Sequence, residues 1–237
     1  MMPFSIVIFY CAKSAFLICA SMNFFKKLFN LNQVISIFIV FEFILITSFG
    51  FLVPIFSLFI INDIRGGSIE IVGFSLAIYW IVKSVLQLPV GKWLDRHKGE
   101  IDDFWSLVVG NTAGALATIA FFFFGKDIWH LYTYEVILGI ADAFTVPPLY
   151  AIFSRHLDKD HEGFEWSVLS SVSFGAGSAA GGAFGGIIAG IYGFRSVFLF
   201  AGLGALCSSI ILLLVRPYIR PRREGAGDKV IIEPKRL

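Results

Sequence analysis

Four ionisable side chains interrupt long apolar stretches of this sequence: Glu42, Lys83, Glu135 and Asp142. An ionisable side chain inside a bilayer costs about 2.5–3.5 kcal/mol on insertion scales, so such residues are kept mainly where they face water or a partner. The chemistry open to them is substrate binding, proton exchange or ion pairing, and snorkelling toward the interface is a further interpretation. Glu42 and Lys83 fall at similar depths, so these two could pair with each other without any transport role.

Glu135 and Asp142 belong to one apolar stretch. Asp142 falls near the midpoint of that stretch and Glu135 lies seven residues earlier, so a helix projects both from the same face. Pro147 and Pro148 remove two backbone donors, and we expect them to bend the helix just beyond Asp142. A bent helix with a carboxylate at mid-depth is suited to binding a substrate or exchanging a proton.

The composition indicates that membrane helices position these side chains. The chain has 237 residues, of which 57% are hydrophobic and 15% are charged, and its mean hydropathy is +0.80. Soluble domains have roughly 45–50% apolar and about 25% charged residues, which excludes an ordinary soluble enzyme, and a disordered chain is far more polar. The 27 Phe and 23 Gly residues are typical of membrane helices, in which small residues mediate packing.

Other kinds of chemistry lack support in the sequence. It contains no phosphate-binding loop, no G-x-S-x-G elbow and no H-E-x-x-H pair, and no nucleophile and base are arranged for an enzyme that acts on lipids. The acidic and histidine residues of 156–162 are interpreted as a solvated loop, and the three scattered cysteines as apolar fillers. The sequence therefore predicts no enzyme, no cofactor, no metal site and no nucleic-acid partner.

Six stretches are long and apolar enough to cross a bilayer as helices, each of which needs about 20 residues. They are too long and too uniformly apolar for the strands of a β-barrel. The sequence predicts an all-α membrane protein, with a six-helix transmembrane bundle over residues 34–216. The predicted spans are 34–61, 69–89, 105–124, 129–153, 168–192 and 197–215.

The distribution of basic residues predicts the orientation. If the segment before the first span is cytoplasmic, that side carries 14 Lys and Arg residues and the other side carries three, which places both ends of the unit in the cytoplasm of a cell inner (plasma) membrane. Residues 1–33 are interpreted as a leader. A true translation start at Met22 is favoured, and a short non-spanning apolar segment is the alternative. Residues 217–237 are predicted to form a basic cytoplasmic tail.

The loop between the second and third predicted spans carries a recognisable motif. Gly91, Asp95, Arg96 and Gly99 form the pattern G-x-x-x-D-R-x-x-G, which resembles the signature loop of the major facilitator superfamily in pattern and in position. A glycine permits a tight turn where a helix ends, and the Asp and Arg can form interactions that hold two helix bundles in one state. The loop differs from the family pattern by one extra residue before Gly99 and by acidic residues in place of the trailing basic run.

The fifth predicted span resembles a second motif of that family, G-x-x-x-G-P-x-x-G-G, which the family associates with antiport. Residues four apart share a helix face, so its glycines form two strips along which backbones can approach closely. Helix packing alone also accounts for such strips. The glycines are Gly177, Gly181 and Gly185 in one strip and Gly182 and Gly186 in the other, with Gly182 at the proline position.

Weaker similarities extend the resemblance across all six spans. Gly50 and Pro54 resemble a G-x-x-x-P stretch in the first helix of the family, and residues 193–198 resemble its link between helices five and six. In the fourth span Glu135 occupies the position of the family's arginine, which removes the usual arginine candidate for proton coupling. In order, these motifs match the N-terminal half of a twelve-helix pattern.

The resemblance implies a function. In the family the first and fourth helices line a central cavity, so Glu42, Glu135 and Asp142 are expected to face a transport path. It implies secondary active transport of a small-molecule substrate by alternating access, with proton coupling and export. Such transporters work between two six-helix bundles, so the mechanism requires a second half or a homodimer within the lipid bilayer. The alternative is a non-transporting membrane scaffold or relic that retains the fold.

Overall fold

Helices make up nearly all of the chain that the computed structural model describes, which is residue 29, residues 31–96 and residues 99–219. Within these ranges there is no strand, and six helical stretches are long and apolar enough to cross a membrane. The predicted all-α, six-helix membrane fold is therefore confirmed. The elements are α2 (Gln33–Gly50), α3 (Phe56–Asp63), α4 (Ile69–Leu94), α5 (Ile101–Phe124), α6 (Ile128–Arg155), α7 (Glu162–Val168), the π-helix η1 (Leu169–Ala176), α8 (Gly177–Tyr192), α9 (Phe194–Leu212) and the 3-10 helix η2 (Leu213–Tyr218).

The predicted leader and tail lie almost entirely outside the described residues. Of the leader 1–33, which includes the expected start at Met22, the structure describes only residues 29 and 31–33. Of the tail 217–237 it describes only residues 217–219. Both assignments stay predictions.

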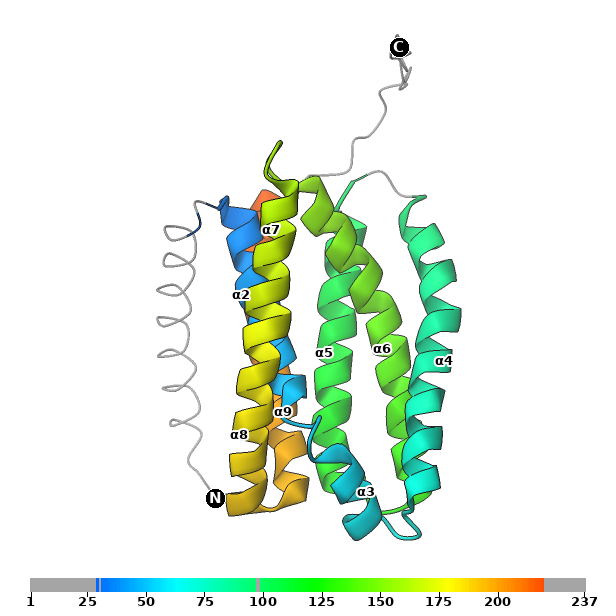
Figure 1. Cartoon of the computed structure of the whole chain (residues 1–237). Helices are drawn as coiled ribbons and strands as arrows, with labels where there is room; N and C mark the ends of the chain where they lie inside the picture. The colour runs from blue at the N-terminus through cyan, green and yellow to red at the C-terminus, as the bar shows by residue number, and fades with distance from the viewer. Residues whose placement is uncertain (1–28, 30, 97–98, 220–237) are drawn as a thin grey trace, which may run out of the picture.

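The first predicted span, 34–61, forms two helices instead of one. Helix α2 ends at Gly50, residues 51–55 turn, and α3 follows. Pro54 explains the break, because it has no N–H to donate to the Gly50 carbonyl and its ring would collide with that group. The turn leads α3 out of line with α2 and places it beside α4 (Figure 1).

The fifth span is longer than the predicted 168–192. Helix α7 begins at Glu162 and continues through η1 into α8, which gives one helical stretch over 162–192. Glu162 and Glu165 lie in its first turn, where carboxylates interact favourably with the positive end of a helix. Glu165 also accepts a hydrogen bond of 3.0 Å from the backbone N–H of Asp158. These local polar contacts start the helix before the apolar stretch begins.

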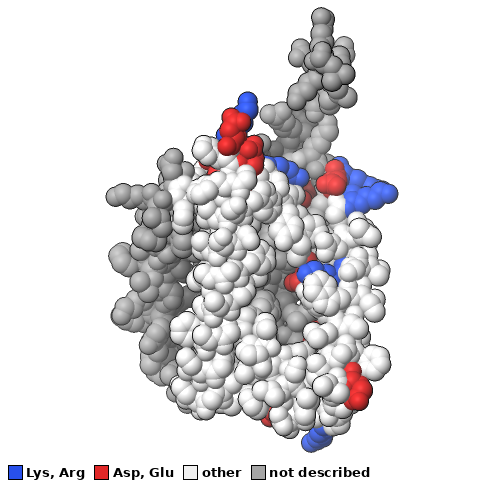
Figure 2. All heavy atoms as spheres, viewed as in Figure 1, with Lys and Arg blue, Asp and Glu red and all other residues white. Residues whose placement is uncertain are grey.

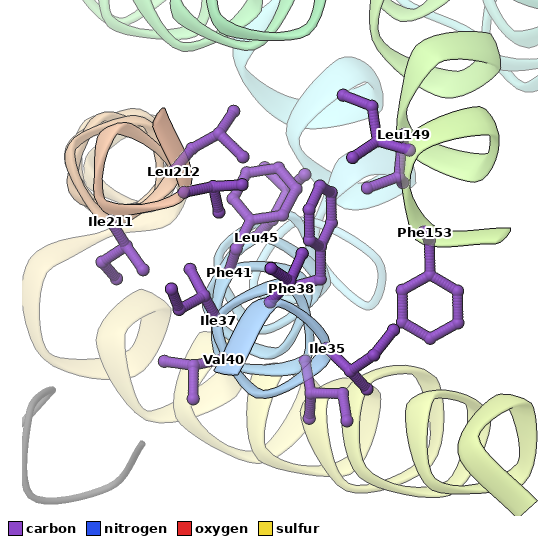
Figure 3. Packing of buried hydrophobic residues seen from close by; sticks show 14 of the residues in the cluster. Ile35, Ile37, Phe38, Val40, Phe41, Leu45, Leu149, Phe153, Ile211 and Leu212 are labelled. Atoms are coloured by element: carbon purple, nitrogen blue, oxygen red, sulfur yellow. The ribbon is translucent and has the colours of Figure 1, made fainter. Parts of the chain in front are cut away.

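Helix α2 forms the centre of the bundle. It packs against α6, η1, α8 and α9. Phe38 is completely buried, and its ring lies edge-on to that of Phe153 of α6, with 6.2 Å between the ring centroids. Figure 3 shows α2 side chains pointing in several directions, toward Phe153 on one side and toward Ile211 and Leu212 on another. A helix that is apolar all round suits such a buried place.

Helix α4 lies at the edge of the bundle (Figure 1). It packs chiefly against α6, with a smaller contact to α3. Most of its apolar surface faces outward, where a membrane protein meets lipid or another protein. Its exposed large apolar side chains are Ile69, Phe74, Leu76, Trp80, Ile81, Val85, Leu88 and Trp93.

The start of α2 and the end of η2 lie at the same end of the bundle, as six crossings require (Figure 1). Asn32 caps α2 there: its Oδ1 accepts a hydrogen bond of 2.9 Å from the Ile35 N–H, and its Nδ2 donates one of 2.8 Å to the His156 carbonyl. Arg155 at the end of α6 pairs with Asp103 in the first turn of α5. These contacts fix the ends of α2, α5 and α6 relative to one another.

Candidate functional site

A cavity of about 590 Å³ lies between the helices. Side chains of α2, α3, α4, α5, α6 and η1 line it, and its volume falls within the roughly 300–1,000 Å³ of small-molecule sites. Figure 2 shows a hollow at mid-height of the visible face with a small group of basic and acidic atoms beside it, while the other charged atoms of that face gather near the two ends.

All four ionisable residues singled out in the sequence line this cavity. Glu42 comes from α2, Lys83 from α4, and Glu135 and Asp142 from α6. The two α6 carboxylates face the same space, in agreement with their spacing of seven residues. The structure thus brings together side chains that are up to 100 residues apart in the sequence, from Glu42 to Asp142.

Lys83 and Asp142 form an ion pair across α4 and α6. The Lys83 Nζ lies 2.9 Å from the Asp142 Oδ2. Tyr79, one turn before Lys83, donates a hydrogen bond of 2.5 Å from its hydroxyl to the same carboxylate oxygen and accepts one of 3.1 Å from Lys83. The sequence suggested a pair between Lys83 and Glu42, which is wrong, because α4 packs against α6 and so brings Lys83 to Asp142.

Glu42 and Glu135 have no such partner. Each is only 3% exposed, and within residues 29, 31–96 and 99–219 neither side chain forms a hydrogen bond or an ion pair. Glu42 lies close enough to interact electrostatically with Asp142 and Lys83. An ionised carboxylate buried without a partner is costly, so a bound proton or a cation in the cavity would stabilise either group.

The aromatic and amide residues of the site were not predicted from the sequence. Tyr79, Tyr134 and Tyr150 line the cavity, and the spacing of four residues between Tyr79 and Lys83 is the signal that could have identified the first. Asn111 also lines it, and its amide donates hydrogen bonds of 3.0 and 2.8 Å to the hydroxyls of two consecutive serines of α9, residues 208–209. Asn111 therefore joins α5 to α9 at the cavity wall.

The signature-loop residues lie away from the cavity. Gly91 belongs to the last turns of α4 instead of a turn, and it faces Pro147 of α6, which continues as a helix through its two prolines. Asp95 is the C-cap of α4 and is exposed, as is Arg96. Gly99 has a φ of +124°, a backbone conformation that favours glycine.

The two glycine strips of the fifth span have different surroundings. Gly177, Gly181 and Gly185 are buried against α2, where a Cβ added to Gly181 would lie 2.7 Å from the Cα atom of Gly50. A Cβ at Gly182 or at Gly186 would have nothing within 4 Å. The first strip is therefore a helix-packing surface, and the second faces away from the described helices.

Comparisons with known proteins agree with this architecture. The family model described as Major Facilitator Superfamily matches residues 38–236. Among solved structures, the in meso crystal structure of the POT family transporter PepTSo is similar, with a TM-score of 0.64 and 13% sequence identity. The match covers 82% of this chain and 40% of that transporter, so this chain spans less than half of its length. No curated protein matches the sequence.

Proposed function

Because this chain belongs to the Major Facilitator Superfamily, we propose that it performs secondary active transport of a small molecule by alternating access, coupled to protons and directed out of the cell. The observation that carries the proposal is the cavity, in which Glu42, Glu135, Asp142 and Lys83 meet within apolar walls. Ionisable groups at membrane depth mark substrate paths and proton relays.

Proton coupling is supported by the two carboxylates that lack a partner among the described residues. Glu42 and Glu135 are stabilised by a proton when the cavity is empty and can release it when another positive charge arrives. Asp142 has Lys83 and Tyr79 beside it, so a change in its charge would strengthen or weaken the contact between α4 and α6. The carboxylates therefore supply the proton-binding groups, and the ion pair connects them to a helix contact that can change.

Alternating access requires a second six-helix bundle, because family transporters bind substrate between two of them. The second bundle would be another copy of this chain, a separately encoded half, or a further part of a longer protein. The outward-facing apolar side of α4 and the open strip at Gly182 and Gly186 are surfaces on which such a bundle can pack. The basic residues of the loops favour an orientation with both ends of the six-helix unit in the cytoplasm, and we place the chain in the cell inner (plasma) membrane.

Proton-linked flux in native membrane vesicles tests the proposal. Inside-out vesicles from cells that make the chain are loaded with a pH-sensitive dye and acidified inside, and a panel of cationic, anionic, zwitterionic and neutral compounds is added. We expect at least one compound to raise the internal pH, and Asp142→Asn to abolish that response. Asp63→Asn is the matched control, because Asp63 is exposed at the end of α3.

A response to no compound, or an unchanged response in Asp142→Asn, would contradict transport by this mechanism. Absence of any flux favours the alternative of a membrane scaffold or relic. Crosslinking in the same vesicles tests the second bundle. We expect either a complex of about twice the mass of this 26.3 kDa chain or a single longer polypeptide. A strictly monomeric species of 26.3 kDa would remove alternating access.

A further inference from the structure

We propose that the cavity selects an organic cation with an apolar or aromatic body, and that the carboxyl groups of Glu42 and Glu135 together supply its one counter-ion. The inference rests on the proposed transport function and names the class of substrate that the site takes. Three features of the cavity carry it: its balance of charge, the aromatic side chains in its wall and its size.

The charge balance of the cavity favours a positive ligand. Its lining contains three carboxylates and one ammonium group. That ammonium, on Lys83, is held by Asp142 at 2.9 Å. An anionic ligand would meet two acidic groups, and the described lining residues offer it no uncommitted cation. A neutral ligand could not replace the positive charge of a proton that leaves either group. A cation satisfies the groups that the protein leaves unsatisfied.

The wall of the cavity suits an organic cation. Aromatic rings attract a cation held over their faces within about 6 Å of the ring centroid. The site already does this with its own ammonium group, because Lys83 Nζ lies 5.4 Å from the ring centroid of Tyr79 and 5.0 Å from that of Trp80. Phe49 and Tyr150 also line the same space, and they add to the aromatic surface that an ammonium or phosphonium group can meet there.

A bare metal ion fits less well. Hard metal cations take six or more oxygen ligands at short distance, and the described residues contain no group of three or more His, Cys, Asp or Glu side chains placed to hold a metal. The cavity of about 590 Å³ is much larger than a metal site and has room for a drug-sized molecule. Its apolar walls at Leu45, Leu138 and Phe174 match the body of an organic ligand.

Charge conservation connects this ligand class to proton exchange. When a monovalent cation binds beside the protonated carboxyl of Glu42 or Glu135, the O–H bond of that carboxyl breaks and the proton leaves to solvent. The cavity then holds the same net charge as before, with the cation in place of the proton. The second carboxyl keeps its proton. One cation is exchanged for one proton in each cycle.

Two probes of nearly equal shape and opposite charge test the selectivity. Equilibrium dialysis of the purified full-length chain in detergent measures binding of radiolabelled tetraphenylphosphonium and tetraphenylborate, with protein-free micelles as the blank. We expect the phosphonium to bind and the borate to bind at least about tenfold more weakly. Glu42→Gln and Glu135→Gln should each lower phosphonium affinity by about tenfold or more, and Asp63→Asn should leave it unchanged.

Several results would overturn the inference: equal or tighter binding of the borate, binding of neither probe, or full phosphonium binding by the Glu42→Gln/Glu135→Gln double variant. Glu42→Asp and Glu135→Asp, which keep the carboxylates, should retain the preference for the cation, and gel filtration of every variant checks its fold. In the vesicle assay, proton movement driven only by anionic or neutral compounds would contradict the proposed cationic substrate. The proposal that the chain is a transporter would still be supported.

Discussion

Helices α2 and α4 are similarly apolar and yet occupy opposite places in the bundle. Of the most apolar window of each, 67% is buried in α2 and 11% in α4. Lipid tails are as apolar as leucine side chains, so apolarity carries a helix into the bilayer without deciding whether protein or lipid surrounds it there. The place of each helix is decided by its close contacts, and those contacts differ between α2 and α4.

Helix α2 is held by packing on several sides. Its ring at Phe38 fits against α6, and its C-terminal residue Gly50 lies against Gly181 of α8. Helix α4 has one main neighbour, α6, to which Lys83 ties it through Asp142. The candidate carboxylate Glu42 therefore stands on the most enclosed of the six spans, and Lys83, which lines the same cavity, stands on the most open one. We expect packing changes to affect α2 most and charge changes to affect α4 most.

Truncating a buried side chain of α2 should have the largest effect. Phe38→Ala removes a completely buried ring, and the cavity left behind should lower the free energy of unfolding by about 3 kcal/mol. Leu88→Ala on α4, where the side chain is 78% exposed, should change it by less than about 0.5 kcal/mol. Unfolding in mixed micelles, followed by circular dichroism, measures both. Equal losses in the two variants would show that α2 and α4 are not held differently.

A matched pair of glycines on α8 sharpens the comparison. A methyl group at position 181 would lie 2.7 Å from both the Cα atom of Gly50 and the carbonyl oxygen of Thr47. Gly181→Ala should therefore destabilise the protein by about 1–3 kcal/mol. Gly182→Ala has open space and gains helix propensity, so it should be neutral or stabilising by up to about 1 kcal/mol. Both changes share the propensity gain, and their difference isolates the packing against α2. An equal change in the free energy of unfolding for both variants would show that Gly181 does not form the close contact between α8 and α2.

The number and type of the spans could be predicted because the length of an apolar run is a local property. The break inside 34–61 was missed because the residues around Pro54 are apolar, so hydropathy does not mark the position. The helix is interrupted there by the backbone chemistry of proline. Which glycine strip is buried could not be predicted either. The strips of Gly181 and Gly182 have the same composition, and only the position of α2 distinguishes them.

The candidate site shows the same division between local and tertiary information. Glu42, Glu135, Asp142 and Lys83 could be found because charged residues are rare in apolar spans. The partner of Lys83 could not, because depth alone allows several pairings and only the packing of α4 on α6 brings Asp142 to it. The cavity likewise arises between helices that are distant in the sequence, so Tyr134 and Tyr150 carried no signal of their own, and Tyr79 could be found only through its spacing from Lys83.

The ion pair between α4 and α6 gives the smallest of the three effects and the most direct test of how the open helix is held. Lys83→Met and Asp142→Asn each remove one partner and leave the other charge largely buried, since these side chains are 14% and 34% exposed. The double variant leaves no unpaired charge at this contact. We expect a coupling energy of about 1 kcal/mol from the double-mutant cycle in mixed micelles.

The exposed pair of Arg65 and Asp127, 3.7 Å apart and 79% and 41% exposed, provides the reference. The cycle built from Arg65→Gln and Asp127→Asn should give a coupling energy below about 0.5 kcal/mol, because solvent screens surface pairs. If the effects of Lys83→Met and Asp142→Asn on the free energy of unfolding were also additive, the ion pair would not hold α4 in place. Apolar contact with α6 would then be what holds it. A larger coupling at Lys83–Asp142 than at the reference pair means that a change of charge in the cavity alters the contact between α4 and α6, which is what coupling between protons and helix movement requires.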